Sequence, residues 1–297
     1  MILDKKNNII MIGDDMLVNA KEILNKARLG KYAIPHFNIN NLEWTRFILE
    51  ECDNNNSPVI LGVSEGAMKY MGGFNVVSAM VRELDKSLNV HVPVVLHLDH
   101  GSSVESAKEA IDNGFTSVMI DASKYDLETN INMTKEVVEY AKERNVTVEA
   151  EVGHIGGAED NISSEIAYAK VEDAVRLFNE TNIDFLAPAL GSVHGIYKGE
   201  PKLDFEKMKE ISDIINAPLV LHGGSGIDDE KIKKAIASGI CKININTELQ
   251  IVWAKGVREF VKTNDAYDPR KIIKAGEEAM KKEIKDKIIL LGSINKA

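Results

Sequence analysis

Short apolar segments alternate with amphipathic segments along most of this chain. The apolar segments are rich in β-branched residues, and polar or glycine-containing turns separate them from stretches whose apolar residues have helical spacing. Short apolar runs of this kind are typical of strands in a parallel sheet, because helices cover both of its faces. The pattern predicts strands at residues 33–39, 57–64, 93–100, 117–123, 147–153, 185–192, 218–224 and 241–246.

The spacing of these strands predicts how they are connected. Their first residues run from 33 to 241, so successive strands start about 30 residues apart, the length of a strand–helix unit with a right-handed crossover. Eight such units in about 250 residues describe a single (β/α)8 TIM barrel, an α/β fold. A doubly wound open sheet is the structural alternative, because period alone does not close a barrel. Both architectures place a site at the carboxyl ends of the strands.

The two ends of the chain differ from this repeat. Residues 1–15 have no clear period and are predicted to be an N-terminal tail, whereas residues 16–297 are predicted to form one domain. The apolar residues of 19–29 fall on one helical stripe that ends at Gly30, which predicts a leading helix that covers one end of the barrel. After the last strand, the pattern predicts a helical extension at the C-terminus.

Composition and charge argue against several classes of protein. The formal charge of −10 and the scattered basic residues argue against a nucleic-acid or anionic-membrane partner. No apolar run approaches the roughly 20 residues that span a bilayer, and the N-terminus lacks a signal-peptide pattern. Cys52 and Cys241 cannot build a disulfide framework. We therefore expect a cytoplasmic protein whose two cysteines are buried small side chains.

Three histidines end predicted strands and indicate a metal site. His100 ends PVVLHLDH, His194 ends FLAPALGSVH, and His222 follows PLVL. Neutral imidazoles suit zinc, and three protein ligands with one open position are typical of a catalytic zinc site. Asp99 precedes His100, and the two side chains can face one site only if the strand has begun to turn there. We expect Gly101 to permit that turn.

The other histidines are expected to be structural. His36, His91 and His154 are interpreted as core or surface residues. His97 shares a strand face with Asp99, so we expect it to orient that carboxylate.

Carboxylates also gather at strand ends. Asp121 follows SVMI, and Glu149 and Glu151 point to one face of their strand. A buried acidic pair needs a cation or protons to relieve its repulsion, which a divalent metal would supply. The alternative is that one of the pair binds a barrel lysine such as Lys242.

Two loops suit phosphate. GGSG (223–226) and NINT (244–247) follow the seventh and eighth predicted strands, whose loops commonly hold phosphate in TIM barrels. The polar, glycine-rich loop at 154–165 is long for a connection in a barrel and predicts a mobile cover over the site.

Taken together, these motifs resemble the class II, metal-dependent fructose-bisphosphate aldolases of the short bacterial type. The likeness runs from about residue 16 to the C-terminus and rests on LHLDHGSS, SVMIDAS, VEAEVG with its GGAED loop, APALGSVHG, LHGGSG and KININT. It implies zinc-dependent cleavage of fructose 1,6-bisphosphate to dihydroxyacetone phosphate and glyceraldehyde 3-phosphate. It implies a zinc ion on His100, His194 and His222, with a second divalent ion at Asp121 and Glu151 and a monovalent cation as further cofactors.

The resemblance also implies roles in catalysis and substrate binding. Asp99 would give a proton to the aldehyde-derived oxygen, and Glu159 would remove one from dihydroxyacetone phosphate. The implied substrate contacts are Asn38, Ser64, Gly195, Gly223, Gly224, Ser225, Asn244, Ile245, Asn246, Thr247 and Arg270. Of these, Arg270 would reach across a subunit interface to the distal phosphate, which implies a homodimer or homotetramer.

Alternative activities remain at this point. Asn246 and Gln250 are neutral amides where some relatives have Asp and Arg, so tagatose 1,6-bisphosphate is the alternative substrate. A metal-dependent hydrolase would have His-x-His on its first strand, which here offers only His36. A non-catalytic, metal-dependent sugar-phosphate sensor is the third reading, although it would not need Asp99 beside a metal ligand. Lys242 stands where a Schiff-base lysine would, but that mechanism would leave the three histidines without a purpose.

Overall fold

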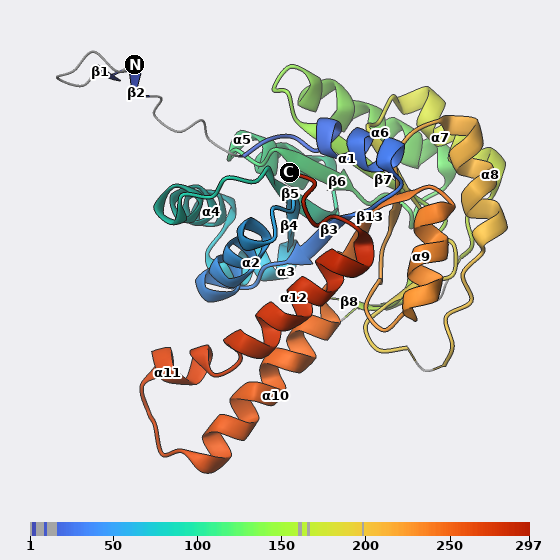
Figure 1. Ribbon diagram of the computed structural model, residues 1–297. Coiled ribbons are helices and arrows are strands. Elements are labelled where there is room, and N and C mark those ends of the chain that lie inside the picture. Colours follow the sequence, from blue (N-terminus) through green and yellow to red (C-terminus); the bar gives the residue numbers. More distant parts are fainter. Residues whose placement is uncertain (1, 4–8, 11–16, 160–161, 165–166, 198) are drawn as a thin grey trace.

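Eight parallel strands close into a barrel, as Figure 1 shows for the computed structural model of the protein. The structure describes residues 2–3, 9–10, 17–159, 162–164, 167–197 and 199–297. The barrel strands are β3 (Ile34–Asn38), β4 (Val59–Ser64), β5 (Val94–Gly101), β6 (Ser117–Ile120), β7 (Thr147–Val152), β10 (Phe185–Pro188), β12 (Leu219–Leu221) and β13 (Ile240–Ile245). They match the eight predicted strands. Because β7 pairs with β10 and β13 pairs with β3, the sheet is closed and the open-sheet alternative is wrong.

Helices surround the barrel, and many begin where the sequence supplies a capping side chain. The side chains of Asn41, Ser103 and Asp126, for example, each accept a hydrogen bond from an amide of the first turn that follows. The helices are α1 (Lys21–Gly30), α2 (Leu42–Asn54), α3 (Glu65–Met71), α4 (Phe74–Leu88), α5 (Val104–Asp112), α6 (Leu127–Lys142), α7 (Val171–Thr181), α8 (Phe205–Ile215), α9 (Asp229–Ala237), α10 (Thr247–Thr263), α11 (Pro269–Lys274) and α12 (Glu277–Leu291).

The barrel interior has an apolar layer and a polar layer. At the amino ends of the strands, the apolar face of α1, which includes Leu24, packs against barrel residues such as Val95 and Phe185. This packing confirms the predicted covering helix. Nearer the carboxyl ends, polar side chains replace the apolar ones, and the fully buried Glu149 and Lys242 lie among them. The barrel therefore buries ionic groups directly beneath the expected site.

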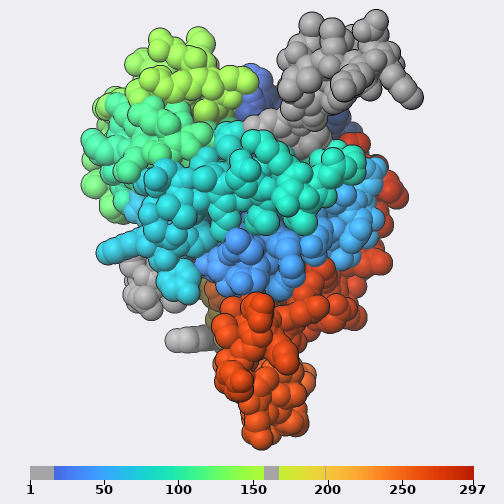
Figure 2. All heavy atoms as spheres, turned by 90° about the vertical axis from the view of Figure 1, so that its left-hand side faces the viewer, coloured from blue at the N-terminus to red at the C-terminus, as the bar shows by residue number. Residues whose placement is uncertain are grey.

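The C-terminal extension forms an arm that stands away from the barrel. Helices α10 and α12 pack side by side, and α11 lies in the connection between them (Figure 1). Figure 2 shows the arm projecting from the body of the molecule. Near its other end, α12 packs against α2, which anchors the arm to the barrel wall. The predicted helical extension is confirmed.

The expected cover loop is partly regular structure. Strands β8 (Gly156–Glu159) and β9 (Ile162–Ser164) pair antiparallel, and β11 (Val193–His194) extends them to a small sheet. The predicted irregular loop therefore contains a hairpin. In the expected N-terminal tail, β1 (Ile2–Leu3) and β2 (Ile9–Ile10) pair antiparallel, and the remainder of 1–15 lies outside the described residues. Within the part of the chain that is described, no helix has the length and apolarity to cross a membrane.

Candidate active site

The end of β5 turns so that Asp99 and His100 both reach the site. The register between β5 and β6 shifts between Leu98 and Gly101, and His100 has a left-handed backbone with φ of 51°. The expected turn is present, but His100 rather than Gly101 makes it. Gly101 is needed for a different reason, because a Cβ there would lie 2.5 Å from the carbonyl oxygen of Met119. A non-glycine residue held at positive φ is a strained arrangement that is typical of functional sites.

Three histidines from separate segments converge above the barrel. His100 ends β5, His194 ends β11 and His222 follows β12, and their facing ring nitrogens lie within 4.8 Å of one another. The ring centroid of His100 is 4.8 Å from that of His194 and 4.6 Å from that of His222. Burial, helped by the neighbouring imidazoles, holds the pKa of His194 and of His222 well below the ordinary value. Both rings are therefore neutral, the form that binds a metal.

A second cluster lies on the other side of His100. Asp121 follows β6 and Glu151 lies in β7, and one ligand atom from each of these and from His100 lies within 4.8 Å of the others. Asp121 Oδ2 is 2.8 Å from His100 Nδ1. Glu151 Oε2 is buried and accepts no hydrogen bond from any described residue, and burial together with Asp121 raises the pKa of Glu151 well above its ordinary value. A buried carboxylate oxygen in this position, beside the histidine cluster, fits a divalent cation.

Two asparagines hold the carboxylate of Asp99. Asn38 Nδ2 donates to Oδ2 at 2.8 Å, and Asn244 Nδ2 donates to Oδ1 at 3.2 Å. Asp99 is buried, which opposes its ionisation, but the surrounding imidazoles and Lys242 hold its pKa well below the ordinary value. The site therefore contains an ionised carboxylate next to the histidine cluster.

The expected role of His97 was wrong. Its Nδ1 is 2.8 Å from the hydroxyl of Ser117, and its Nε2 is 3.4 Å from Glu149 Oε2. Asn38 occupies the position that orients Asp99. The expectation for His36 is confirmed, because this residue is completely buried in the barrel, where burial lowers its pKa to about 3.

Glu149 lies beneath the histidine cluster and belongs to neither group of residues that could hold a metal ion. Its Oε1 is 2.7 Å from His222 Nε2, and its Oε2 accepts a hydrogen bond from Lys242 Nζ at 2.8 Å. Of the two readings of the acidic pair, pairing with Lys242 is therefore confirmed for Glu149, while Glu151 belongs to the second cluster.

A polar cavity of about 150 Å³ opens beside Asp99 and His194. It is lined by Asn38, Asn40, Ser64, Asp99, His194, Gly195, Gly223, Ser225, Asn244, Asn246, Thr247 and Gln250. Most of the expected substrate contacts therefore surround one space. Asn40 was missed, although it continues the alternation of His36 and Asn38 on one strand face and could have been found from that spacing.

Three expected substrate contacts do not line the cavity, namely Ile245, Gly224 and Arg270, of which Arg270 lies in the arm. The side chain of Ile245 packs in the hydrophobic core, so a contact between this residue and substrate would have to come from its backbone. The amide of Gly224 donates to the carbonyl of Asn244 at 2.9 Å and is not free for phosphate. By contrast, Gly223 lines the cavity, and a Cβ there would lie 2.1 Å from the carbonyl oxygen of Val193. Gly223 thus allows the loop after β12 to pass close to β11.

The serines of the cavity are already fixed by helix capping. Ser64 Oγ accepts a hydrogen bond from the amide of Ala67 at the start of α3. Ser225 Oγ accepts from the amides of Asn246 and Glu248, both at 3.3 Å, at the start of α10. Each hydroxyl therefore keeps its hydrogen for another acceptor, and the positive end of α10 faces the cavity.

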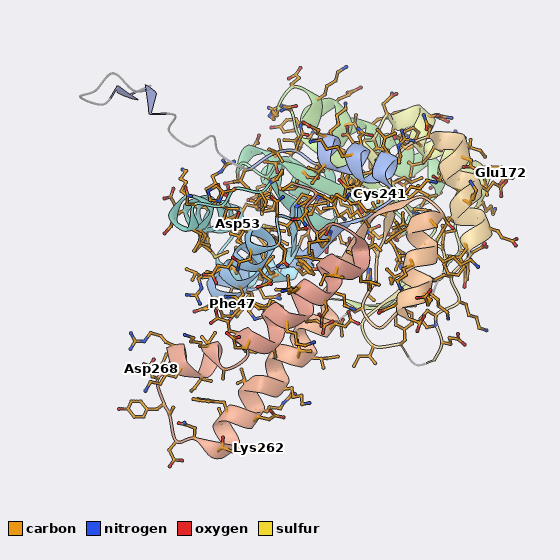
Figure 3. The ribbon with its side chains drawn as sticks, viewed as in Figure 1. Phe47, Asp53, Glu172, Cys241, Lys262 and Asp268 are labelled. Carbon is orange, nitrogen blue, oxygen red and sulfur yellow. The ribbon has the colours of Figure 1, made fainter. Side chains whose placement is uncertain are left out.

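Two expected residues are not placed at this cavity. The backbone of Glu159 lies in β8, where it pairs with Ile162, and its side chain lies outside the described parts. Arg270 lies in α11, in the arm, with its side chain 88% exposed and paired with Asp268 at 2.8 Å. Figure 3 labels Asp268 on the arm, away from the barrel.

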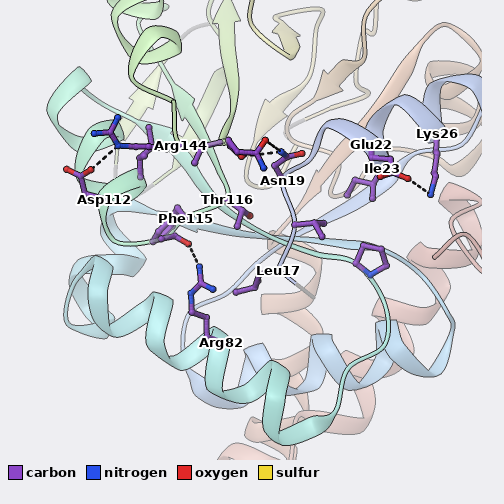
Figure 4. Close-up of a pocket in the computed structure, with 16 residues that line it drawn as sticks. Leu17, Asn19, Glu22, Ile23, Lys26, Arg82, Asp112, Phe115, Thr116 and Arg144 are labelled. Atoms are coloured by element: carbon purple, nitrogen blue, oxygen red, sulfur yellow. Dashed lines mark hydrogen bonds and ion pairs between the residues drawn. The ribbon is translucent and has the colours of Figure 1, made fainter. Parts of the chain in front are cut away.

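A larger cavity, of about 680 Å³, lies at the opposite end of the barrel (Figure 4). Pro93 and Thr116, which directly precede β5 and β6, line it, so it opens at the amino ends of the strands. Its charged side chains bind each other or the backbone: Arg82 donates to the carbonyl of Gly114, for example, and Arg144 pairs with Asp112. Sites in TIM barrels lie at the carboxyl ends, where the histidine cluster is.

The fold and the site together define a TIM-barrel enzyme whose histidine cluster could hold a metal ion. The family model for "Fructose-bisphosphate aldolase class-II" matches residues 18–296. A fructose-bisphosphate aldolase from Geobacillus stearothermophilus is 56% identical over 95% of this chain and 99% of its own length, and one from Staphylococcus epidermidis is 53% identical over the same shares. The crystal structure of the YdjI aldolase from Escherichia coli K12 has a TM-score of 0.84 at 36% identity and covers 95% of this chain and 99% of its own. This chain belongs to the class II fructose-bisphosphate aldolase family.

Proposed function

We propose that this protein catalyses the reversible, zinc-dependent cleavage of fructose 1,6-bisphosphate to dihydroxyacetone phosphate and glyceraldehyde 3-phosphate. The observation that carries the proposal is the ionised Asp99 beside three converging imidazoles, at the wall of one polar cavity. The 53–56% identical relatives named fructose-bisphosphate aldolase support the choice of substrate.

His100, His194 and His222 would hold the zinc ion, which would polarise the ketone carbonyl of the substrate as a Lewis acid. Because Asp99 is ionised and its two oxygens accept from Asn38 and Asn244, it can take the proton of the C4 hydroxyl during cleavage. The same residue then returns that proton to the aldehyde-derived oxygen in the synthetic direction. Asp121 and Glu151 would hold a second or alternate cation.

The phosphate of dihydroxyacetone phosphate would lie between Gly223, Ser225 and the first turn of α10. Support comes from the cavity lining and from the helix N-terminus, whose amides and dipole favour anions. In this proposal Ser64 contacts the glyceraldehyde half. Glu159, on the β8–β9 hairpin, removes the proton from dihydroxyacetone phosphate.

Tagatose 1,6-bisphosphate is the second candidate substrate, and it differs from fructose 1,6-bisphosphate in configuration at C4. The supporting observation is that Asn246 and Gln250, both neutral amides, line the cavity. The substrate is therefore decided by cleavage rates with the two bisphosphates.

We also propose that the protein assembles as at least a dimer through its arm and works in the cytoplasm. Within the described residues, α11 buries no side chain, while Ile251 and Val261 of α10 are about half exposed and Tyr267 is 94% exposed. An arm with these apolar groups suits a partner surface. Arg270 would then reach the phosphate in the partner's cavity. Sedimentation analysis tests the dimer, and Arg270→Ala should raise KM with little change in kcat.

The experiment that tests the activity combines metal analysis with a cleavage assay. The purified protein is loaded with zinc and supplied with each bisphosphate, and triose phosphate release is followed. Faster cleavage of fructose 1,6-bisphosphate supports the proposal, and faster cleavage of the tagatose isomer favours the second candidate. Stoichiometric zinc with no cleavage of either compound contradicts both and favours a non-catalytic sugar-phosphate sensor.

A further inference from the structure

Lys242 is a charged residue that the mechanism above does not use. Its side chain is 0% exposed on β13, inside the barrel, and it lines neither the cavity nor the metal clusters. Its Nζ donates to Glu149 Oε2 at 2.8 Å and to Asn244 Oδ1 at 2.9 Å. Burying an ammonium and a carboxylate is costly even when they pair, so the pair is weak evidence for a purely stabilising role.

Through Glu149, Lys242 acts on the ring of His222. Lys242 binds one oxygen of Glu149, and the other oxygen is 2.7 Å from His222 Nε2. An ionised carboxylate only accepts hydrogen bonds, so Nε2 carries the ring hydrogen. His222 Nδ1 is then the ring nitrogen without a hydrogen. It lies 2.8 Å from His100 Nε2, on the side of the histidine cluster, and 3.2 Å from the side-chain amide nitrogen of Asn244.

Through Asn244, Lys242 acts on Asp99. An ammonium only donates, so the amide atom of Asn244 that faces Lys242 must be the oxygen. The amide nitrogen then faces Asp99 Oδ1 at 3.2 Å. The orientation of this amide, and hence the donor that Asp99 receives, follows from the charge of Lys242.

We propose that Lys242 is the positioning residue of the site, which fixes the metal-binding tautomer of His222 through Glu149 and aims the amide of Asn244 at Asp99. The inference rests on the proposed zinc site. The chain of contacts crosses β13, β7 and the end of β12, so it couples three strands of the barrel. A variant that disturbs the direction of these hydrogen bonds should therefore bind zinc more weakly, even when the protein still folds. Second-layer partners of metal-binding histidines commonly contribute about 10–100-fold in metal affinity.

Glu149→Gln reverses the donor and acceptor roles between residue 149 and His222. The ammonium of Lys242 requires the amide oxygen of Gln on its side, so the amide NH₂ turns toward His222 Nε2. That nitrogen must then accept, and the ring hydrogen moves to Nδ1, where it blocks the metal. We expect zinc affinity, measured by competition with a chelating indicator, to fall about 10–100-fold.

The double variant Glu149→Gln/Lys242→Gln restores the original donor and acceptor roles with uncharged side chains. Gln at 242 can accept from the amide at 149 and donate to Asn244, so the oxygen at 149 can face His222 again. The double variant should recover most of the zinc affinity that Glu149→Gln loses. Glu277→Gln is the matched control, because it neutralises a partly buried carboxylate that pairs with Lys281 at 2.8 Å in α12, and its zinc affinity should equal that of the unaltered protein.

Wild-type zinc affinity in a folded Glu149→Gln variant overturns the proposal, and so does an equal loss in the single and double variants. If these variants do not fold, NMR of the histidine ring nitrogens in the unaltered protein tests the proposal, because it shows which nitrogen of His222 carries the hydrogen. A hydrogen on His222 Nε2 in both the zinc-free and zinc-loaded protein is expected, and a hydrogen on Nδ1 overturns the positioning role. Failure of the unaltered protein to bind zinc would instead defeat the proposed zinc site, while the zinc-free spectrum still tests the tautomer.

Discussion

The side-chain amide of Asn38 donates a hydrogen bond to the carboxylate of Asp99 at 2.8 Å, from one barrel strand to the end of another. Hydrogen bonds to charged groups contribute about 1.5–3 kcal/mol. Asn38→Ala should therefore lower kcat/KM for bisphosphate cleavage by about 10–100-fold, with zinc content unchanged. Unchanged kcat/KM would show that Asp99 does not depend on this contact. Loss of zinc would show that the contact supports the metal cluster instead.

Metal removal should abolish cleavage, because none of the described residues that line the cavity is a lysine that could replace the Lewis acid. Lys242 is buried and already donates to Glu149 and Asn244. Exhaustive chelation should remove activity and added zinc should restore it. Full cleavage after chelation, or an imine trapped by borohydride, would contradict the metal-dependent mechanism.

The backbone of His100 should make glycine a better replacement than alanine. Both substitutions remove the imidazole and should reduce zinc binding, but φ at this residue is 51°, which costs a residue with a Cβ about 1–2 kcal/mol. Zinc-free His100→Gly should therefore unfold at a higher urea concentration than zinc-free His100→Ala, by about 1 kcal/mol in unfolding free energy. Equal stability of the two would show that the turn relaxes when the side chain is lost.

Gly62 should be required by the buried ring of His36. A Cβ at residue 62 would lie 1.5 Å from His36 Nε2, and both residues are in neighbouring barrel strands. Gly62→Ala should lower the unfolding free energy by about 1–3 kcal/mol, as overpacked cores do. Adding His36→Ala should relieve the clash, so the double variant should lose less than the sum of the single variants. Additive losses in urea unfolding would rule out the clash.

Glu159 should govern proton removal from dihydroxyacetone phosphate. That step precedes addition of the aldehyde, so solvent-hydrogen exchange into the ketone measures it alone. Glu159→Gln should slow the exchange by about 100-fold or more, the usual contribution of a general base, with zinc content and phosphate affinity little changed. If exchange stays at the normal rate while cleavage falls, the base is another residue.

The sequence was sufficient to predict the barrel and the convergence of three histidines. The strands have a regular period, and strand ends in a parallel barrel meet at one rim, so His100, His194 and His222 could be brought together before any coordinates existed. The turn at His100 was harder, because a register shift depends on how β5 pairs with β6.

Contacts across the barrel could not be predicted in the same way. Lys242, Glu149 and His222 come from different strands, and their partners depend on strand order, tilt and rotamers. His97 illustrates the difficulty. It shares a strand face with Asp99, yet its closest polar partner is Ser117 on the neighbouring strand. Alternation along one strand predicts on which face of the sheet a side chain lies, but it does not predict which side chain of another strand it contacts.

The apolar residues that α1 packs against inside the barrel also affect the ionic groups above them. This layer closes the amino end of the barrel and, with the covering helix, forms an apolar region of low dielectric constant below Lys242 and Glu149. Both charged groups are fully buried, so their mutual attraction is stronger than that of the same pair at a surface. A helix at the opposite end of the barrel thus helps set the electric field around the histidine cluster and Asp99.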